Sequence, residues 1–449
     1  MLKITYFLPI VLFFTANSAG IKLQLIHRRI KFSERSLLSG VYGLQPMSGN
    51  SNSRRNDRIN RPIRFGGEIY GEMPMYAGAD LGIAQYLVAF RVGSPAQSVA
   101  LIADTGSDLT WTKCSYGCGG GCRRSSGRLF DADRSTSFKT VECSSTTCTV
   151  DLAGAFSLSR CSPPSDPCAY DYRYADGSSA EGIFAGETVE LKLAKGRGKA
   201  RLQNVLIGCT KNFSGSSFQT SDGVLGLGYS NFSFAHAAAA RFGDKFSYCL
   251  LDHLAAKNKS SYITFSSGRS ISASISAGPI RYTDLVLGVI GSNYAVNVRG
   301  ISIGGSWLRI PSDTWNNLSG SGGVIIDSGS SLTALAPPAY APVIAALNRS
   351  LARFGDPHVK IGPMECCFNS TGFHESVVPK LAIHFAGGTR FEPPVKSYVI
   401  DAAPGVVCLG FVQAASPGVS VIGNILQQNH WWEFDLGNRR LGFAASDCT

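Results

Sequence analysis

The sequence has few charged residues and no long apolar run beyond its N-terminus. Asp, Glu, Lys and Arg make up 16% of its 449 residues and hydrophobic residues 44%, so a core can form and general disorder is excluded. After residue 20 no apolar stretch approaches the 18 residues of a membrane span. The seven His are scattered without a metal-ligand grouping, so we expect neither a metal nor a cofactor.

Acidic residues are scarce mainly near the N-terminus. Residues 1–75 contain 11 Lys or Arg and four Asp or Glu, a charge of +7, whereas the rest of the chain contains 31 and 27, a charge of +4. The net charge of +11 therefore lies mostly outside the body that we expect to fold. This distribution disfavours a nucleic-acid-binding protein, which needs a basic face on its folded domain.

The N-terminus has the parts of a secretory signal peptide. Lys3 precedes the apolar run 4–14, and small residues follow at 16–19, so we predict a signal peptide over 1–19. Residues 20–75 are basic, rich in Ser and Asn, and predicted to be a pro-segment. A disordered tail without a role is the alternative.

Cysteines and glycosylation sequons favour the secretory route. The chain has 13 Cys, and its six N-x-S/T sequons are at Asn212, Asn231, Asn258, Asn317, Asn348 and Asn369. We therefore expect an extracellular or vacuolar protein. A chloroplast protein is the alternative, because a basic N-terminus poor in acids is also typical of transit peptides.

The remaining sequence is typical of an all-β protein. It has 50 Gly, and short apolar runs alternate with turn residues, as in the predicted strands 85–92 and 99–103. Apolar residues at helical spacing predict peripheral helices over 338–354 and 233–242. The Ser-rich stretch 267–276 is predicted to be a loop.

One pattern occurs twice. The segment 102–107 (IADTGS) recurs as 325–330 (IIDSGS), and each copy is an apolar strand that leads into Asp-(Ser/Thr)-Gly-Ser. Each copy is also followed by a run of apolar residues and glycine, at 223–228 and at 421–424. Two copies are too few for a solenoid, so the repeat favours two duplicated β lobes.

Two such loops can support acid–base chemistry. An Asp at the end of a buried strand, beside Gly and hydroxyl side chains, is held rigidly and accepts hydrogen bonds. If the loops meet, the carboxylates of Asp104 and Asp327 come into contact and share one proton, because like charges at that distance cannot both ionise. One can then act as general base on a water while the other donates to a carbonyl.

The chain resembles the pepsin family of aspartic proteases, in its plant nepenthesin-like branch, from about residue 85 to 449. The motifs that carry the resemblance are DTGSDLTW (104–111), FSYCL (246–250), DSGS (327–330) and VIGNILQQ (421–428). It implies a bilobal, mostly antiparallel β fold with an active-site cleft between lobes 76–248 and 249–449. It also implies that Asp104 and Asp327 are the catalytic pair, supported by their loop neighbours Thr105, Gly106, Ser107, Ser328, Gly329 and Ser330. The family more often has Thr at the position of Ser330.

The resemblance extends to a flap over the site. Tyr174 matches the flap tyrosine, with Trp111 as its hydrogen-bond partner, and the hairpin tip includes Asp176, Gly177 and Ser178. The dipeptide Asp-Gly at 176–177 is by itself a hairpin-turn signal. Ala175 replaces the commoner Gly.

Six disulfides are implied by the same resemblance, because sequence alone does not fix the pairing of so many cysteines. They are Cys114–Cys118, Cys122–Cys209, Cys143–Cys168, Cys148–Cys161, Cys249–Cys448 and Cys367–Cys408, which leaves Cys366 unpaired. Zinc is the alternative for Cys114, Cys118 and Cys122, but no His lies in the segment 114–168.

Together these observations predict a monomeric acid endopeptidase that cleaves extended protein or peptide substrates near bulky apolar residues. An inactive relative that acts as an inhibitor or binding protein is the main alternative. A glycosidase with two carboxylates is also conceivable, but it would not need a duplicated Asp-(Ser/Thr)-Gly loop.

Overall fold

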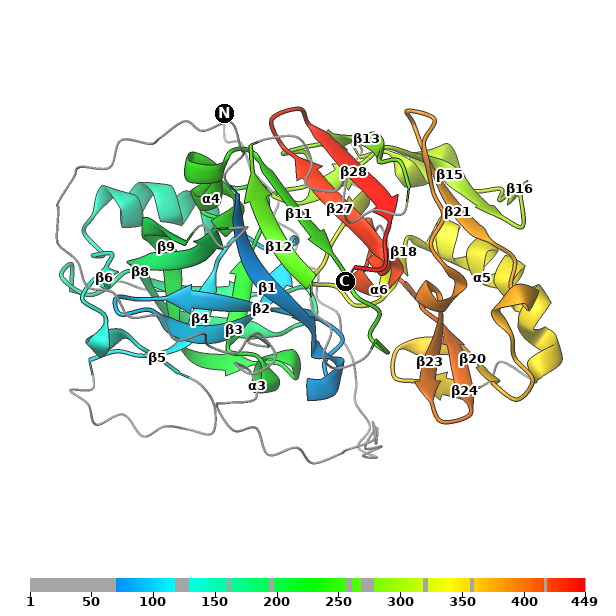
Figure 1. The fold of residues 1–449 in the computed structure, drawn as a ribbon, viewed down its shortest axis with the longest axis horizontal. Coiled ribbons are helices and arrows are strands. Elements are labelled where there is room, and N and C mark those ends of the chain that lie inside the picture. Colours follow the sequence, from blue (N-terminus) through cyan, green and yellow to red (C-terminus); the bar gives the residue numbers. More distant parts are fainter. Residues whose placement is uncertain are drawn as a thin grey trace, which may run out of the picture. The chain divides into compact units, whose positions relative to one another are not determined.

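Short β-strands dominate the chain, as the sequence predicts, and the all-β fold class is confirmed. The computed structural model describes residues 70–117, 129–159, 163–193, 198–255, 261–267, 278–317, 322–355, 359–415 and 418–448 (Figure 1). The predicted signal peptide, most of the predicted pro-segment and nearly all of the predicted loop 267–276 lie outside these residues.

The strands divide into two sets along the chain. Those of the first half are β1 (Gly71–Ala77), β2 (Tyr86–Val92), β3 (Gln97–Asp104), β4 (Trp111–Ser115), β5 (Phe130–Asp131), β6 (Lys139–Thr140), β7 (Ala169–Arg173), β8 (Ser179–Leu193), β9 (Lys199–Ser214), β10 (Gly223–Gly226), β11 (Lys245–Cys249) and β12 (Ser261–Ser266). Those of the second half are β13 (Arg281–Val286), β14 (Tyr294–Val296), β15 (Val298–Ile303), β16 (Ser306–Trp307), β17 (Val324–Ile326), β18 (Thr333–Leu335), β19 (Val359–Ile361), β20 (Met364–Asn369), β21 (Leu381–Phe385), β22 (Arg390–Phe391), β23 (Val399–Ala403), β24 (Val406–Leu409), β25 (Phe411–Gln413), β26 (Ser420–Ile422), β27 (His430–Asp435) and β28 (Arg440–Ala445).

The sequence repeat corresponds to a repeated strand arrangement. In the first half β10 pairs in parallel with β3 and antiparallel with β4. In the second half β26 pairs in parallel with β17 and antiparallel with β18. Within each copy, an equivalent threonine accepts a hydrogen bond from a glycine at the end of the parallel strand. Thr110 Oγ1 accepts from Gly226 N at 3.1 Å, and Thr333 Oγ1 accepts from Gly423 N at 3.2 Å. The two copies of the repeat therefore have one architecture.

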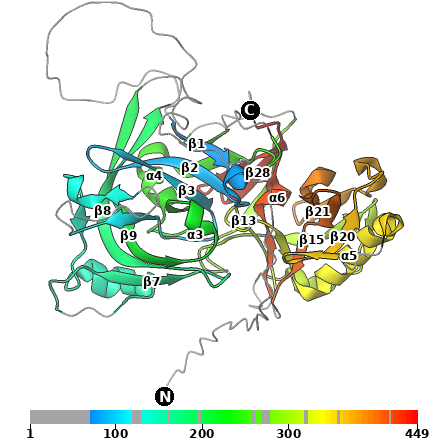
Figure 2. The same ribbon diagram turned by 90° about the horizontal axis from the view of Figure 1, so that it is seen from below.

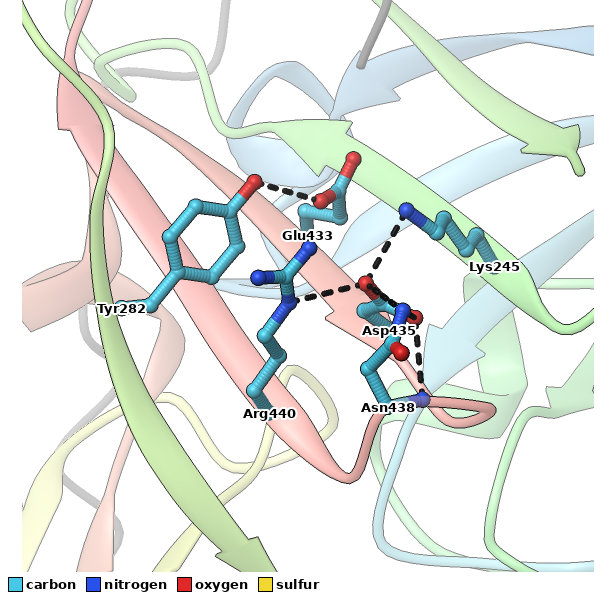
Figure 3. Close-up of polar contacts among 6 residues, drawn as sticks. All are labelled: Lys245, Tyr282, Glu433, Asp435, Asn438 and Arg440. Atoms are coloured by element: carbon cyan, nitrogen blue, oxygen red, sulfur yellow. Dashed lines mark hydrogen bonds and ion pairs between the residues drawn. The ribbon is translucent and has the colours of Figure 1, made fainter. Parts of the chain in front are cut away.

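A continuous ladder joins strands from both ends of the chain. Its order is β1, β12, β11, β27, β28 and β13, with every pair antiparallel, and these strands lie side by side in Figure 1. Polar side chains of this ladder and of the turn after β27 form the cluster in Figure 3, where the buried Asp435 contacts Lys245, Asn438 and Arg440 while Tyr282 Oη donates to the buried Glu433. Residues nearly 200 positions apart are thereby fixed to each other.

The two predicted helices are present. The helix α4 (Phe234–Phe242) begins after Ser233, whose side chain accepts from His236 N at 3.3 Å, a normal N-cap. The helix α5 (Pro337–Leu351) starts with two prolines and contacts β15 and β20 (Figure 2). The described residues also form the shorter helices α2 (Ala153–Ala155), α3 (Ser217–Thr220) and α6 (Asn424–Gln427).

Both predicted lobe boundaries fall inside strands of the ladder. The boundary at 75/76 lies within β1, where Gly71 to Met75 pair with β12 and both Met73 and Met75 are buried. The boundary at 248/249 lies within β11. The ladder needs these residues, so the chain has no natural break at either position.

Candidate active site

The two repeated aspartates lie at the ends of buried strands. Asp104 is the last residue of β3, and Asp327 directly follows β17. Their side chains are 7% and 8% exposed, respectively. Each strand is a short apolar segment in a buried sheet, so its end holds the carboxylate at a fixed position.

Each carboxylate is held by its own loop in the same way. For Asp104, Oδ1 accepts from Gly106 N at 2.9 Å and Oδ2 accepts from Ser107 Oγ at 2.5 Å. For Asp327, Oδ1 accepts from Gly329 N at 2.8 Å and Oδ2 accepts from Ser330 Oγ at 2.5 Å. The hydroxyl of Ser330 therefore makes the same contact in its loop as that of Ser107, although the family more often has Thr there.

Thr105 and Ser328 connect the two loops to each other. Thr105 N donates to Ser328 Oγ at 3.1 Å, and that hydroxyl donates to Ala103 O at 2.9 Å. Reciprocally, Ser328 N donates to Thr105 Oγ1 at 2.9 Å, and that hydroxyl donates to Ile326 O at 3.3 Å. The two backbone N–H groups and the two backbone carbonyls in these hydrogen bonds belong to buried residues. Each hydroxyl therefore pairs one backbone donor and one backbone acceptor that would otherwise be unpaired.

Gly106 and Gly329 allow the carboxylates to approach. A Cβ atom on Gly106 would lie 2.8 Å from Cγ of Asp327, and one on Gly329 would lie 2.6 Å from Cγ of Asp104. No carbon atom fits at these distances. Each glycine is thus required by the aspartate of the other loop.

The environment favours the protonated form of one carboxyl group. Burial, together with the neighbouring charge of Asp327, raises the pKa of Asp104, although hydrogen bonds from Ser107 and Gly106 oppose the shift. Asp327 is within hydrogen-bond contact of Asp104, so a proton on Asp104 can lie between the two carboxyl groups. Such a pair offers a base and an acid at the same place.

Buried amide and phenol side chains form hydrogen bonds that support the backbone of the Asp327 loop. The sequence alone did not identify these residues as part of the site. Gln427 Nε2 donates to Asp327 O at 3.1 Å, and its Oε1 accepts from Tyr248 Oη at 2.6 Å. Asn424 Nδ2 donates to Ser328 O at 3.0 Å. These residues lie in the quoted motifs 246–250 and 421–428, and a run of amide side chains in an apolar segment was the available signal.

The predicted flap forms a hairpin between β7 and β8. Gly177 has φ of 83°, Gly177 N donates to Tyr174 O at 3.0 Å, and Asp176 Oδ1 accepts from Ser178 N at 2.9 Å. Ala175 is not among the described residues with positive φ, so its side chain causes no backbone strain there.

Aromatic side chains connect the hairpin to the first loop. Trp111 Nε1 donates to Tyr174 Oη at 2.6 Å, and both rings pack edge-on against Phe218. Burial and the nearby charge of Asp104 raise the pKa of Tyr174, so its hydroxyl stays protonated. The structure thus brings together Tyr174, Trp111 and the Asp104 loop.

Four disulfides join described residues, and only two of them match the expected pairing. Cys249–Cys448 and Cys367–Cys408 form as expected, and Cys366 is unpaired. The expected pairs Cys114–Cys118 and Cys122–Cys209 are wrong, because Cys114 pairs with Cys209, and Cys118 and Cys122 lie outside the described residues. The cause is the parallel pairing of β4 with β9, which brings the two Cα atoms within 5.0 Å.

The pairing in the other cysteine-rich segment also differs. Cys148 pairs with Cys168, so the expected pairs Cys143–Cys168 and Cys148–Cys161 are wrong. Cys148 lies on the helical turn Thr147–Leu152, which packs with Cys168 and Tyr170 in one apolar cluster. Cys143 is disulfide-bonded as well, and Cys161 lies outside the described residues.

The sequons differ in their accessibility. Asn212, Asn231 and Asn369 are exposed, Asn348 is half-buried on α5, and Asn258 lies outside the described residues. The expected glycosylation at Asn317 conflicts with the structure. This side chain is buried, and its Nδ2 donates to Val296 O at 3.2 Å and to Asn297 Oδ1 at 2.9 Å. A glycan on Nδ2 would replace one of these two N–H donors, and the buried side chain leaves no room for a sugar.

The described part of the chain contains neither a grouping of metal ligands nor a membrane-spanning helix. No three His, Cys, Asp or Glu residues there are grouped so that they could hold a metal ion. No helix among the described residues has both the length and the apolar character needed to cross a membrane.

Comparison with known families identifies relatives over most of the chain. The models of the xylanase inhibitor N-terminal and C-terminal domains match residues 86–267 and 293–445. Aspartyl protease family protein 2 of Arabidopsis thaliana is 34% identical over 385 residues, which cover 83% of this chain and 73% of that protein. Aspartic proteinase nepenthesin-1 of Nepenthes gracilis is 31% identical over 403 residues, with 88% and 84% covered.

Solved structures support the fold. The crystal structure of edgp superimposes with a TM-score of 0.66 at 19% identity, covering 84% of this chain and 95% of that one. Basic 7S globulin from soybean gives a TM-score of 0.65 at 18% identity, covering 85% and 98%. At this identity the match concerns the fold alone.

Proposed function

The chain belongs to the plant pepsin-like aspartic proteases, and we propose that Asp104 and Asp327 perform its peptide hydrolysis as a pair that shares one proton. The observation that carries this proposal is the reciprocal hold of the two loops. Thr105 and Ser328 hydrogen-bond across them, and each glycine leaves room for the opposite carboxylate. The raised pKa of Asp104 supports a retained proton.

The chemistry follows from the shared proton. The ionised carboxylate takes a proton from a water molecule, whose oxygen bonds to the scissile carbonyl carbon, while the protonated carboxyl donates to the carbonyl oxygen. A tetrahedral diol results. Its collapse breaks the C–N bond as a proton passes to the amine nitrogen, and the pair again holds one proton.

Substrate is held between this pair and the hairpin that carries Tyr174. Protein and peptide chains are the substrates of an aspartic protease, and we expect bulky apolar residues beside the scissile bond. The hydrogen bond from Trp111 to Tyr174 fixes the hairpin, so Tyr174 acts as a positioning residue that transfers no proton.

The test uses full-length protein activated by acid and assayed on denatured globin at acidic pH. Asp104→Asn and Asp327→Asn should fold normally and each lose activity by more than about 10²–10⁴-fold, because acid–base help is worth at least that much and the pair acts as a unit. The double variant should be little worse than either single variant. Tyr174→Ala should lose less.

A second candidate function comes from the description of the matching domain models as those of xylanase inhibitors. A protein that only binds could dispense with either aspartate, whereas this chain retains both complete loops. If wild-type protein and Asp104→Asn were equally inactive on globin after removal of the N-terminal segment, the binding function would replace the protease function.

We further propose entry into the secretory route, with residence in the apoplast or vacuole and the chloroplast as the alternative. The predicted signal peptide, the sequons and the disulfides support this route. Imaging of a fluorescent fusion, together with an endoglycosidase mobility shift, tests it. Fluorescence in plastids without a shift would contradict it.

A further inference from the structure

A cavity of about 500 Å³ lies on the first half of the chain and shares no residue with the candidate active site. It is formed between β9 and the helix α4, which contact each other (Figure 1). One wall is the segment 201–206 of β9, and the other contains residues 231–233 and the outer face of α4. Its size is in the range of small-ligand sites.

The shape of this cavity follows from an irregularity in β9. The register between β8 and β9 shifts between Glu187 and Val189, and Asn204 adopts φ of 55°. Gln203 and Asn204 are consequently exposed at one rim. Across from them, Ala237 and Ala240 of α4 have small side chains that leave the space open.

The lining offers many hydrogen-bond donors and an apolar floor. Arg201 and Arg241 contribute guanidinium groups, and none of the described lining residues is acidic. The nearest carboxylate to Arg201 is Glu190 at 3.8 Å, which already pairs with Arg91 and Lys199 at 2.8 Å. Leu206 and the two alanines supply apolar surface. A sugar ring matches this combination, since it has both C–H faces and oxygen acceptors.

A residue at the rim of the cavity is a site where a sugar can be attached. Asn231 lines the cavity, is exposed, and starts the sequon Asn231-Phe232-Ser233. We propose that this cavity seats the first sugars of an N-linked glycan attached to Asn231. Because the glycan is tethered at the rim, its effective concentration is high and weak contacts suffice to keep it there.

The attachment itself is the ordinary reaction of the secretory pathway. Asn231 Nδ2 bonds to the anomeric carbon of a sugar on a lipid-linked diphosphate donor. The sugar–phosphate bond breaks, and an amide proton is released with the lipid diphosphate. Asn212 and Asn369 carry exposed sequons that do not line this cavity, so glycans on them should extend into solvent.

The test compares native with denatured deglycosylation, site by site. Full-length protein secreted from yeast is treated with peptide N-glycosidase, and glycopeptides are followed by mass spectrometry. We expect release at Asn231 to be at least about tenfold slower in the native than in the denatured protein, with a much smaller ratio at Asn212 and Asn369. Absence of a glycan at Asn231, or native release at the denatured rate, would overturn the proposal.

A variant that fills the cavity provides the second measurement. Ala240→Trp should displace the glycan and raise native release at Asn231 by about tenfold, whereas Ala240→Ser should leave it unchanged. Asn231→Gln should lower the melting temperature more than Asn212→Gln does. If Ala240→Trp left the native release rate unchanged, protection would not arise in this cavity and the proposal would fail.

Discussion

At the scale of single residues, the hydroxyl groups of Thr105 and Ser328 connect the Asp104 loop to the Asp327 loop. Each accepts from a buried amide and donates to a buried carbonyl of the opposite loop. Thr105→Ala or Ser328→Ala leaves both groups unpaired, at a cost of roughly 1–3 kcal/mol for each group. We expect each variant to lower the free energy of unfolding by about 2–6 kcal/mol in urea titrations.

The matched control is Ser328→Thr, which keeps the hydroxyl and makes the two loops alike. It should retain most of both stability and activity on globin. Equal losses in Ser328→Thr and Ser328→Ala would mean that space at this position matters more than the hydrogen bonds.

His253 sets a lower pH limit on stability. Burial lowers its pKa to about 4, despite the nearby Asp252, and its Nε2 has no partner among the described residues. The unfolded chain binds this proton near pH 6.5, so stability falls by roughly 3 kcal/mol as the pH drops from about 6.5 to about 4. We expect His253→Phe, which keeps a ring against Tyr86, to flatten this part of the melting-temperature profile.

His374 provides the comparison, because its side chain is exposed. His374→Phe should leave the pH profile of the melting temperature unchanged. A slope that persisted in His253→Phe would assign it to other groups.

At the scale of secondary structure, the antiparallel pair β27–β28 and its neighbour β11 depend on one buried carboxylate. Burial alone would raise the pKa of Asp435. Hydrogen bonds from Asn438, Lys245 and Arg440 outweigh that effect and lower this pKa (Figure 3). Asp435→Asn leaves Lys245 and Arg440 without their counter-charge, which we expect to cost about 3 kcal/mol.

The pH dependence of that loss identifies its origin. Because the folded pKa of Asp435 is depressed, its contribution is complete above the ordinary carboxyl range and disappears as the pH falls through the folded value. Urea titrations at pH 5 and pH 2.5 should therefore show a difference between wild type and Asp435→Asn that shrinks in acid. Glu365→Gln removes the exposed pair with Lys360 and should change stability little at either pH.

At the scale of the whole molecule, β1 determines where the N-terminal segment can be removed. The strand begins at Gly71 and contributes buried Met73 and Met75 to the ladder. We expect N-terminal sequencing of acid-activated protein to find a first residue at or before Gly71. A mature protein starting at Tyr76 would lose five residues of this strand and should not be stable, so recovery of an active form with that terminus would contradict the prediction.

Disulfide mapping tests the cysteine pairing. Mass spectrometry of a non-reduced digest should find Cys114 linked to Cys209 and Cys148 linked to Cys168, with Cys366 as a free thiol. Each cross-link is worth about 2–4 kcal/mol, so reduction should inactivate the protein. Reduced cysteines with bound zinc would contradict this.

How much the sequence predicts depends on how local the signal is. The repeat of an apolar strand and an Asp-(Ser/Thr)-Gly-Ser loop locates Asp104 and Asp327, and periodicity locates α4 and α5. Pairing of Cys114 with Cys209 depends on strand neighbours that are 95 residues apart, which no local pattern reveals. Burial of the sequon at Asn317, and of Gln427 below the loop, likewise depends on contacts formed only in the folded chain.

The disulfide between Cys249 and Cys448 has a consequence for survival among proteases. It joins the end of the described chain to the strand β11, 199 residues earlier, so the whole second half forms a covalent ring. A single cut in any loop between these two residues opens the ring but releases no fragment, and the ladder through β27 and β28 still holds both ends. An enzyme that digests proteins is surrounded by copies of itself, and this closure lets a molecule nicked by its neighbours remain in one piece.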